Sequence, residues 1–170
     1  VVPSGFATHI TRTSASGRYM YVIGRDGKAS MIDMWMKEPK NVAEIQVCND
    51  ARAIDTSKHK DYLDKYAVVG CYWPPSIVTL EADTLDPLKI IATGSYTYDQ
   101  NEYLREARVA AIIASHDKPE WVINIKETGQ VWLYDYSNVN NPKITMVEAE
   151  RFLHDGGWDL SKRYFLTAAN

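Results

Sequence analysis

The sequence has few of the features that mark the commonest functional classes. No apolar run approaches the roughly 20 residues that cross a bilayer, and no charged segment followed by an apolar one opens the chain, as it would in a secretory signal. An excess of positive charge is also missing, because 19 Lys and Arg stand against 22 Asp and Glu. We therefore expect no membrane span and no nucleic-acid partner.

Cysteine is scarce as well. Cys48 and Cys71 belong to no Cys-x-x-Cys or Cys-x-x-Cys-His unit, so a metal cluster and a covalently attached c-type haem have no motif in this chain. We interpret both cysteines as small, buried apolar residues. Glycine-rich phosphate loops, paired-histidine metal helices and the Gly-x-Ser-x-Gly elbow are missing too. Hydrolase and nucleotide-binding functions therefore lack a specific motif.

What the sequence does contain is 45% apolar residues, enough for a folded core, arranged mainly in short β-branched and aromatic runs between Gly, Pro, Asn and Asp. Sustained helical periodicity is almost absent, so the pattern predicts an all-β protein. An aromatic residue opens an apolar run at intervals of roughly 50 residues, at Tyr19, Tyr66, Trp121 and Tyr164. The chain is therefore built from an internal repeat.

The pattern within each repeat predicts four strands. They are a leading strand, the two strands of a hairpin such as the one that turns at Asp26-Gly27, and a further strand after a proline-containing connection. Such units are typical of β-propeller blades, whose first strand lines a central channel and whose fourth lies at the rim. The chain 1–170 then divides into about three blades and the start of a fourth, with approximate bounds 7–51, 52–107, 108–150 and 151–170.

The leading strand of the last repeat is expected at Arg151–His154. A short β-sandwich is the alternative architecture, but the even recurrence of four strands favours the propeller. Because blades bury their faces against neighbours, we expect the functional molecule to be longer than this chain.

Polar residues on the leading strands would face the channel. They are His9, Arg12 and Arg52, with Arg108 and His154 on or near such strands. A neutral imidazole is a good iron ligand, and the planar guanidinium suits buried carboxylates. Strand alternation separates His9 from Arg12 unless a bulge intervenes. Taken alone, a histidine such as His9 is more often a structural residue than a ligand, and Arg25 would be interpreted as a solvated turn residue.

Several longer strings resemble the cytochrome cd1 nitrite reductases. They are residues 9–19, which read His-Ile-Thr-Arg-Thr-Ser-Ala-Ser-Gly-Arg-Tyr, and residues 22–28, 31–39, 72–75, 108–112, 126–129, 150–157 and 163–170. The resemblance runs along essentially the whole chain. Haem d1 assembly proteins share the same propeller.

The resemblance implies an eight-bladed propeller that carries haem d1 in a periplasmic homodimer. A c-type haem on a domain outside this chain would pass electrons to haem d1, where nitrite is reduced to nitric oxide. The electron donor would be a small c-type cytochrome or a cupredoxin. This chain would be one part of the d1 domain and inactive alone. A haem d1 biosynthesis or assembly propeller and a non-enzymatic scaffold are the alternatives.

The resemblance also assigns site residues. The family's proximal iron ligand falls on His9, the arginines that hold the macrocycle's carboxylates fall on Arg12, Arg25 and Arg52, and an aromatic pocket residue falls on Tyr72. Arginines that converge on buried carboxylates offset the free-energy cost of removing those charges from water. The family's two distal histidines, which help to protonate the departing oxygen, are expected beyond Asn170. They are not assigned to His116 or His154, so no catalytic residue is predicted within the chain.

Overall fold

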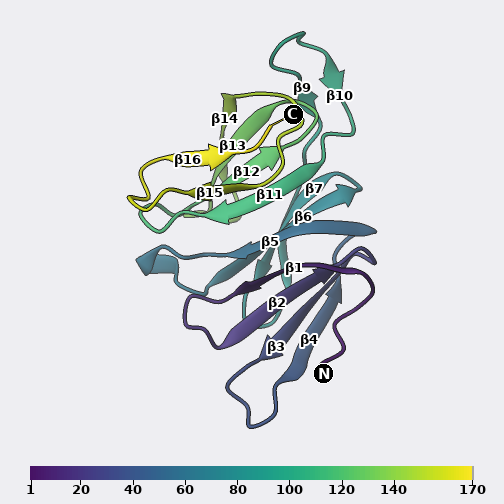
Figure 1. Ribbon diagram of the computed structural model, residues 1–170, viewed down its shortest axis with the longest axis vertical. Helices are drawn as coiled ribbons and strands as arrows, with labels where there is room; N and C mark the ends of the chain where they lie inside the picture. Colours follow the sequence, from purple (N-terminus) through teal and green to yellow (C-terminus); the bar gives the residue numbers. More distant parts are fainter. Residues whose placement is uncertain (170) are drawn as a thin grey trace.

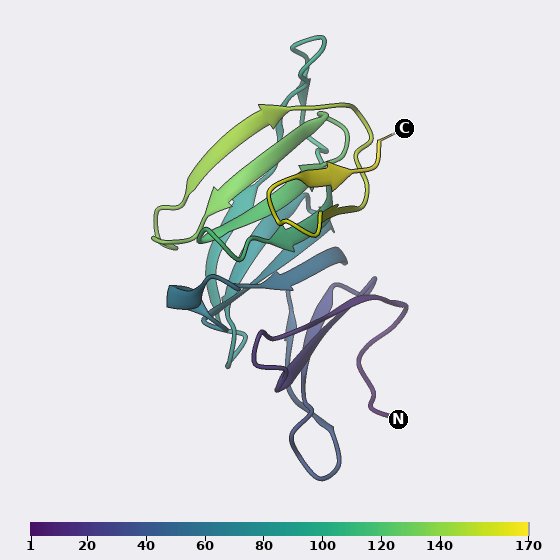
Figure 2. The same cartoon turned by 60° about the vertical axis from the view of Figure 1, so that its left-hand side comes forward.

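The computed structural model describes residues 1–169, so Asn170, the last residue of the string at 163–170, lies outside the described residues. Three four-stranded antiparallel sheets follow one another from the N-terminal to the C-terminal end of the molecule (Figures 1 and 2). A two-stranded sheet ends the chain. Within residues 1–169, no helix has the length and apolar character that a membrane span needs.

Each four-stranded sheet is a simple meander in which consecutive strands pair. The first contains β1 (Thr8–Thr13), β2 (Tyr19–Gly24), β3 (Lys28–Asp33) and β4 (Lys40–Gln46). The second contains β5 (Asp50–Thr56), β6 (Tyr66–Trp73), β7 (Ser76–Glu81) and β8 (Pro87–Ala92). The third contains β11 (Val109–Ala114), β12 (Glu120–Ile125), β13 (Gln130–Asp135) and β14 (Lys143–Glu148). The prediction of an all-β chain with four strands per repeat is confirmed.

Two details differ from the sequence-based expectation. The chain between the second and third sheets contains a small hairpin of β9 (Ser95–Tyr96) and β10 (Tyr103–Leu104), which projects from the top of the molecule and was not predicted (Figure 1). The expected leading strand at Arg151–His154 was wrong, because the strand is β15 (Gly156–Trp158), paired with β16 (Phe165–Thr167). Phe152 instead forms a turn with positive φ, and its N–H donates to the Lys126 carbonyl of the third sheet at 2.7 Å.

The cores lie between neighbouring sheets. β1, β5 and β11 run side by side through the middle of the molecule (Figure 1). One apolar cluster joins the first and second sheets through residues such as Tyr21, Ile54 and Leu80. A second joins the second and third sheets around the fully buried Trp121 and Tyr134. Since each sheet buries its faces against its neighbours, removing one sheet would expose the apolar face of the next.

Buried polar contacts set how the second and third sheets sit against each other. The Asp55 carboxylate, with its side chain 1% exposed, accepts a hydrogen bond from the Ala114 N–H at 2.8 Å and pairs with Lys58 at 3.0 Å. Trp121 Nε1 donates to the Thr56 carbonyl at 3.2 Å. Buried groups of this kind are costly unless paired, so they favour a single packing arrangement of the inner strands.

Cys48 and Cys71 correct the sequence interpretation. Both side chains are buried, as expected, but the two residues form a disulfide with their Cα atoms 6.4 Å apart. Cys48 follows β4 and Cys71 lies in β6, so the bond joins the end of the first sheet to the second. No motif connects the two cysteines in the sequence. The pair exists because neighbouring sheets pack together, and a pattern of spacing does not report that.

Candidate functional site

The first strand of each four-stranded sheet carries an irregularity at the same place. Pairing with the second strand skips one residue of each first strand, namely His9 in β1, Arg52 in β5 and Ala110 in β11. The ladder between β5 and β6 also skips Tyr72 of β6. Each of the three first-strand residues lies at the same distance before the residue whose N–H closes the following hairpin, namely Ser14, Ser57 and Ser115. Such bulges redirect a side chain at a defined point of a strand.

His9 is oriented by the neighbouring sheet. Its Nδ1 lies 3.0 Å from the backbone carbonyl oxygen of Arg52. Because a carbonyl oxygen only accepts, Nδ1 carries the proton and donates it, which leaves the lone pair of Nε2 free. The residue is exposed on its strand. An imidazole held in one tautomer by a backbone carbonyl is the arrangement that metal-binding histidines commonly show.

Arg12 lies on the same side of β1 as His9. Both line a small cavity of about 120 Å³ formed by the inner strands, together with Arg52 of β5 and residues of β11 and β15. Plain alternation would have separated the two side chains, but the bulge at His9 shifts the phase of the strand. The structure therefore brings His9, Arg12 and Arg52 together.

Tyr72, near the end of β6, packs beneath three cationic side chains. The guanidinium carbons of Arg52 and Arg108 lie 4.7 and 4.9 Å from its ring centre, and Lys126 Nζ lies 6.0 Å away. Tyr72 is only 8% exposed. Cations over an aromatic face are attracted by its quadrupole. We call Arg52, Tyr72, Arg108 and Lys126 the cationic wall.

Charge on the cationic wall is only partly neutralised within the described chain. Arg108 is paired: its Nε donates to Glu127 Oε1 at 2.6 Å, and this hydrogen bond raises the pKa of the Arg108 guanidinium. Arg52 and Lys126 form no ion pair with any residue in 1–169. Arg52 Nε is also buried and, among these residues, has no hydrogen-bond partner. An unpaired buried donor of this kind calls for an anionic or carbonyl-bearing ligand.

Arg25 stands apart from the other predicted site residues. It lies in the turn between β2 and β3, its side chain is 55% exposed, and its guanidinium lies 3.4 Å from Asp50 Oδ2. Asp50 in turn lines a cavity of about 710 Å³ together with Tyr72 and Arg108. Arg25 therefore reaches the edge of the cationic wall through Asp50, and no contact joins it to His9.

Three residues of this region received no role from the sequence. Arg108 and His154 were expected only to lie on or near leading strands, and Lys126 was not singled out. His154 takes the place of His9 in the fourth repeat, because Asp159 closes the next hairpin by donating to the Tyr164 carbonyl at 3.0 Å, as Ser14 does to Tyr19 at 2.9 Å. Aligning the repeats by the residues that close these hairpins would have identified His154. The prediction of distal histidines beyond Asn170 concerns residues outside the described chain and stays a prediction.

The His154 side chain is half exposed and oriented by its surroundings. Its Nδ1 lies 3.2 Å from Asp155 Oδ1, and its carbonyl accepts from Asn124 Nδ2 at 2.8 Å. With Lys126 and Phe152 it lines a cavity of about 400 Å³. His116 lies instead in the turn after β11, where burial, helped by Lys162 and Lys58, lowers its pKa. Of these two histidines, only His154 lines a cavity beside the cationic wall.

The comparisons with known proteins agree along the whole chain. The family model described as Cytochrome D1 heme domain matches residues 1–170. A nitrite reductase of Stutzerimonas stutzeri is 53% identical over 170 residues, which are 100% of this chain and 30% of that protein. A dihydro-heme d1 dehydrogenase of Pseudomonas aeruginosa is 24% identical over 165 residues, 96% of this chain and 31% of that protein. The chain thus spans about a third of the length of these relatives.

A solved structure shows the same fold. The dihydro-heme d1 dehydrogenase NirN in complex with DHE superposes with a TM-score of 0.79 at 23% identity, covering 99% of this chain and 34% of that one. The predicted propeller-type all-β architecture is thereby confirmed. The residues present also fit an anionic iron macrocycle, since an imidazole with a free Nε2 contacts Arg52, whose buried Nε has no hydrogen-bond partner within residues 1–169. The chain belongs to the cytochrome D1 heme domain family.

Proposed function

We propose that this chain forms part of the haem d1 domain of a nitrite reductase that reduces nitrite to nitric oxide. The observation that carries the proposal is His9, whose tautomer leaves Nε2 free while its Nδ1 contacts Arg52, a residue whose buried Nε has no partner among the described residues. The chain is 53% identical to a nitrite reductase but only 24% identical to a dihydro-heme d1 dehydrogenase, which supports nitrite reduction over the dehydrogenase activity. Residues 7–51, 52–107, 108–150 and 151–170 would then belong to successive blades of an eight-bladed ring.

In this proposal the chain's residues hold and orient the cofactor. His9 Nε2 would bind the iron, and Arg12, Arg52 and Lys126 would donate hydrogen bonds to the macrocycle's carboxylates. Tyr72, with Arg52 over its ring, would border the cofactor, and Arg25 would border the same site through Asp50. When bound, haem d1 would supply the redox-active iron for the reduction.

We propose that His154 delivers protons, a role that the sequence-based expectation gave only to histidines beyond Asn170. Reduction of nitrite to nitric oxide consumes protons and releases water, so the leaving oxygen needs a donor. An imidazole whose Nδ1 faces the Asp155 carboxylate keeps its other nitrogen available. Lys126, which lines the same cavity, adds positive charge that attracts the nitrite anion.

The partners follow from the same proposal. Nitrite is the substrate, and a small c-type cytochrome or a cupredoxin delivers electrons through a haem c on another domain of a homodimer. We infer a periplasmic location. The disulfide between Cys48 and Cys71 supports it, because such bonds persist in oxidising compartments.

A haem d1 biosynthesis or assembly role is the second candidate, favoured by the shared fold with the dihydro-heme d1 dehydrogenase. The absorption spectrum of the full-length protein, reconstituted with haem d1, separates the possibilities. We expect a long-wavelength band that shifts on reduction with dithionite and again on addition of nitrite, with release of nitric oxide. Uptake of haem d1 without nitric oxide release would favour assembly, and no uptake would favour a scaffold.

Replacing Arg52 tests the cationic wall. Arg52→Met keeps the length of the side chain but removes its charge and donors, and we expect haem d1 to bind about tenfold more weakly, as when a hydrogen bond to a charged group is lost. Titration of the apo full-length protein with haem d1 measures this. Arg18→Met is the matched control, because Arg18 pairs with Asp33 away from the wall. Equal weakening in both variants would contradict the assignment.

A further inference from the structure

The disulfide lies between two parts of the proposed cofactor site. Cys71 directly precedes Tyr72 in β6, and Cys48 lies against the turn that carries Arg25. Neither cysteine is used by the site as described above. The contacts on each side of the bond show what it holds together.

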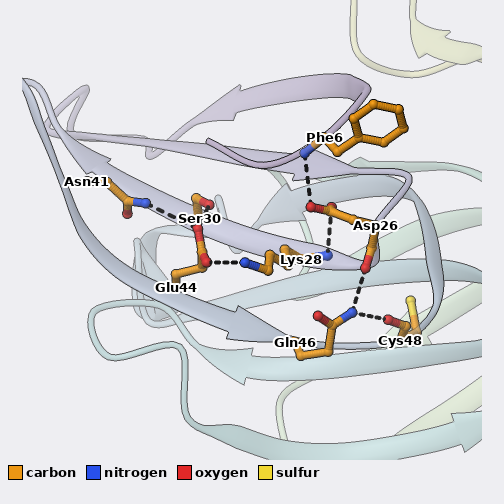
Figure 3. A network of polar contacts seen from close by, with 8 residues as sticks. All are labelled: Phe6, Asp26, Lys28, Ser30, Asn41, Glu44, Gln46 and Cys48. Carbon is orange, nitrogen blue, oxygen red and sulfur yellow. Dashed lines mark hydrogen bonds and ion pairs between the residues drawn. The ribbon is translucent and has the colours of Figure 1, made fainter. Parts of the chain in front are cut away.

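On one side, the turn between β2 and β3 rests on Cys48. The N–H groups of Val47 and Cys48 both donate to the Gly27 carbonyl, at 2.9 and 3.2 Å. Figure 3 shows the Gln46 amide between the carbonyls of Asp26 and Cys48, to which it donates at 2.5 and 2.6 Å. A Cβ on Gly27 would lie 1.7 Å from the Cys48 carbonyl oxygen, so the contact leaves no room for a side chain.

The far end of this turn is fastened as well. The Asp26 carboxylate accepts from the N–H groups of Phe6 at 2.9 Å and Lys28 at 3.3 Å (Figure 3). These contacts tie the turn that carries Arg25 to Cys48.

On the other side, the segment after Cys48 follows the end of β6. The Asn49 N–H donates to the Trp73 carbonyl at 2.8 Å, and Asp50 pairs with Trp73 while holding Arg25. The ladder between β5 and β6 is irregular here, with register shifts on both sides of Ala51. Pairing with β7 stays regular up to Cys71 and Ser76, so it places β6 within its own sheet. The disulfide at the fully buried Cys71 adds a covalent link from this point to the end of the first sheet, where pairing with β5 is irregular.

We propose that Cys48 and Cys71 are a positioning pair for the haem d1 site, whose disulfide holds Tyr72 at a set distance from the turn that carries Arg25. The oxidised protein then binds haem d1 more tightly than the reduced protein, so the site is completed only after the cysteines have been oxidised. This inference rests on the proposed function, because it takes haem d1 as the ligand of the cationic wall.

The test compares haem d1 affinities of the apo full-length protein. We expect Cys48→Ala/Cys71→Ala to bind haem d1 about tenfold more weakly than oxidised wild type, the low end of the effect of groups that orient direct ligands. Wild type refolded under reductant, with both thiols confirmed by titration, should show the same loss and recover on reoxidation. This second comparison needs no substitution, so it serves even where the double variant folds poorly.

The variant Tyr134→Phe tests whether the disulfide only stabilises the fold. This control removes the buried hydrogen bond of Tyr134 to Thr79, away from the wall, and lowers stability without touching Cys48 or Cys71. Near-UV circular dichroism and Tm are recorded for each protein. Equal affinities of oxidised and reduced protein, or a loss no larger than that of Tyr134→Phe at matched Tm, would overturn the inference alone. Failure of oxidised wild type to bind haem d1 would overturn the proposed function, and the inference with it.

Discussion

His9→Ala is expected to weaken haem d1 binding by the full-length protein by at least about 100-fold, beyond the effect of losing a group that only orients a metal ligand. The substitution removes an imidazole whose tautomer is set by the Arg52 carbonyl, with Nε2 free for iron. The remaining cations would still attract the macrocycle's carboxylates, so residual, weakly held haem d1 should show an altered axial-ligand spectrum. Absorption titration of the apo protein, oxidised and reduced, measures both effects.

Two further variants make this test specific. His9→Gly leaves space at the ligand position, so added imidazole should restore the wild-type spectrum if the missing group is the ligand itself. His116→Ala serves as the matched histidine control, because His116 lies in a turn after β11 and contributes to none of the site's contacts. A His9→Ala protein with normal haem d1 spectra and turnover would reduce His9 to a structural histidine.

His154→Ala is expected to lower nitrite turnover by about 100- to 10,000-fold, the range typical of a general acid, while haem d1 binding changes little. The reason is geometric: His154 takes the position of His9 in the fourth repeat, and its Nδ1 lies 3.2 Å from the Asp155 carboxylate. Steady-state nitric oxide production and the haem d1 titration are measured on the same preparation.

A loss of nitrite turnover without a loss of haem d1 binding would identify His154 as a proton donor. His154→Gln keeps a polar side chain of similar reach but cannot act as an acid, so it should be as slow as His154→Ala. His116→Ala should turn over like wild type. If His154→Ala released haem d1 instead, the residue would belong to the cofactor's binding contacts, and proton delivery would have to come from other histidines.

The local residue pattern was sufficient to predict most of the strands, because side-chain alternation and turn-forming residues act over only a few positions. Asp26-Gly27 forms the expected turn, with Gly27 at φ +75°, and each repeat closes its first hairpin through the same backbone contact. The leading strand of the last repeat was misplaced because Phe152 is tied to Lys126, a contact made across the sheet boundary. The β9–β10 hairpin was missed because its strands are only two residues long.

For the site, the sequence by itself determined which residue types stand on the leading strands: one histidine and two arginines in the first two repeats. The family resemblance then assigned roles to these residues. The tertiary structure decided which of them meet. A bulge, which depends on pairing with the next strand, turns His9 and Arg12 to one side. Packing of the second sheet against the third gathers Arg52, Arg108 and Lys126 around Tyr72, and packing of the first against the second joins Cys48 to Cys71. Contacts between residues far apart in the chain depend on how whole sheets bury their apolar faces, and no local pattern of residues reports that packing.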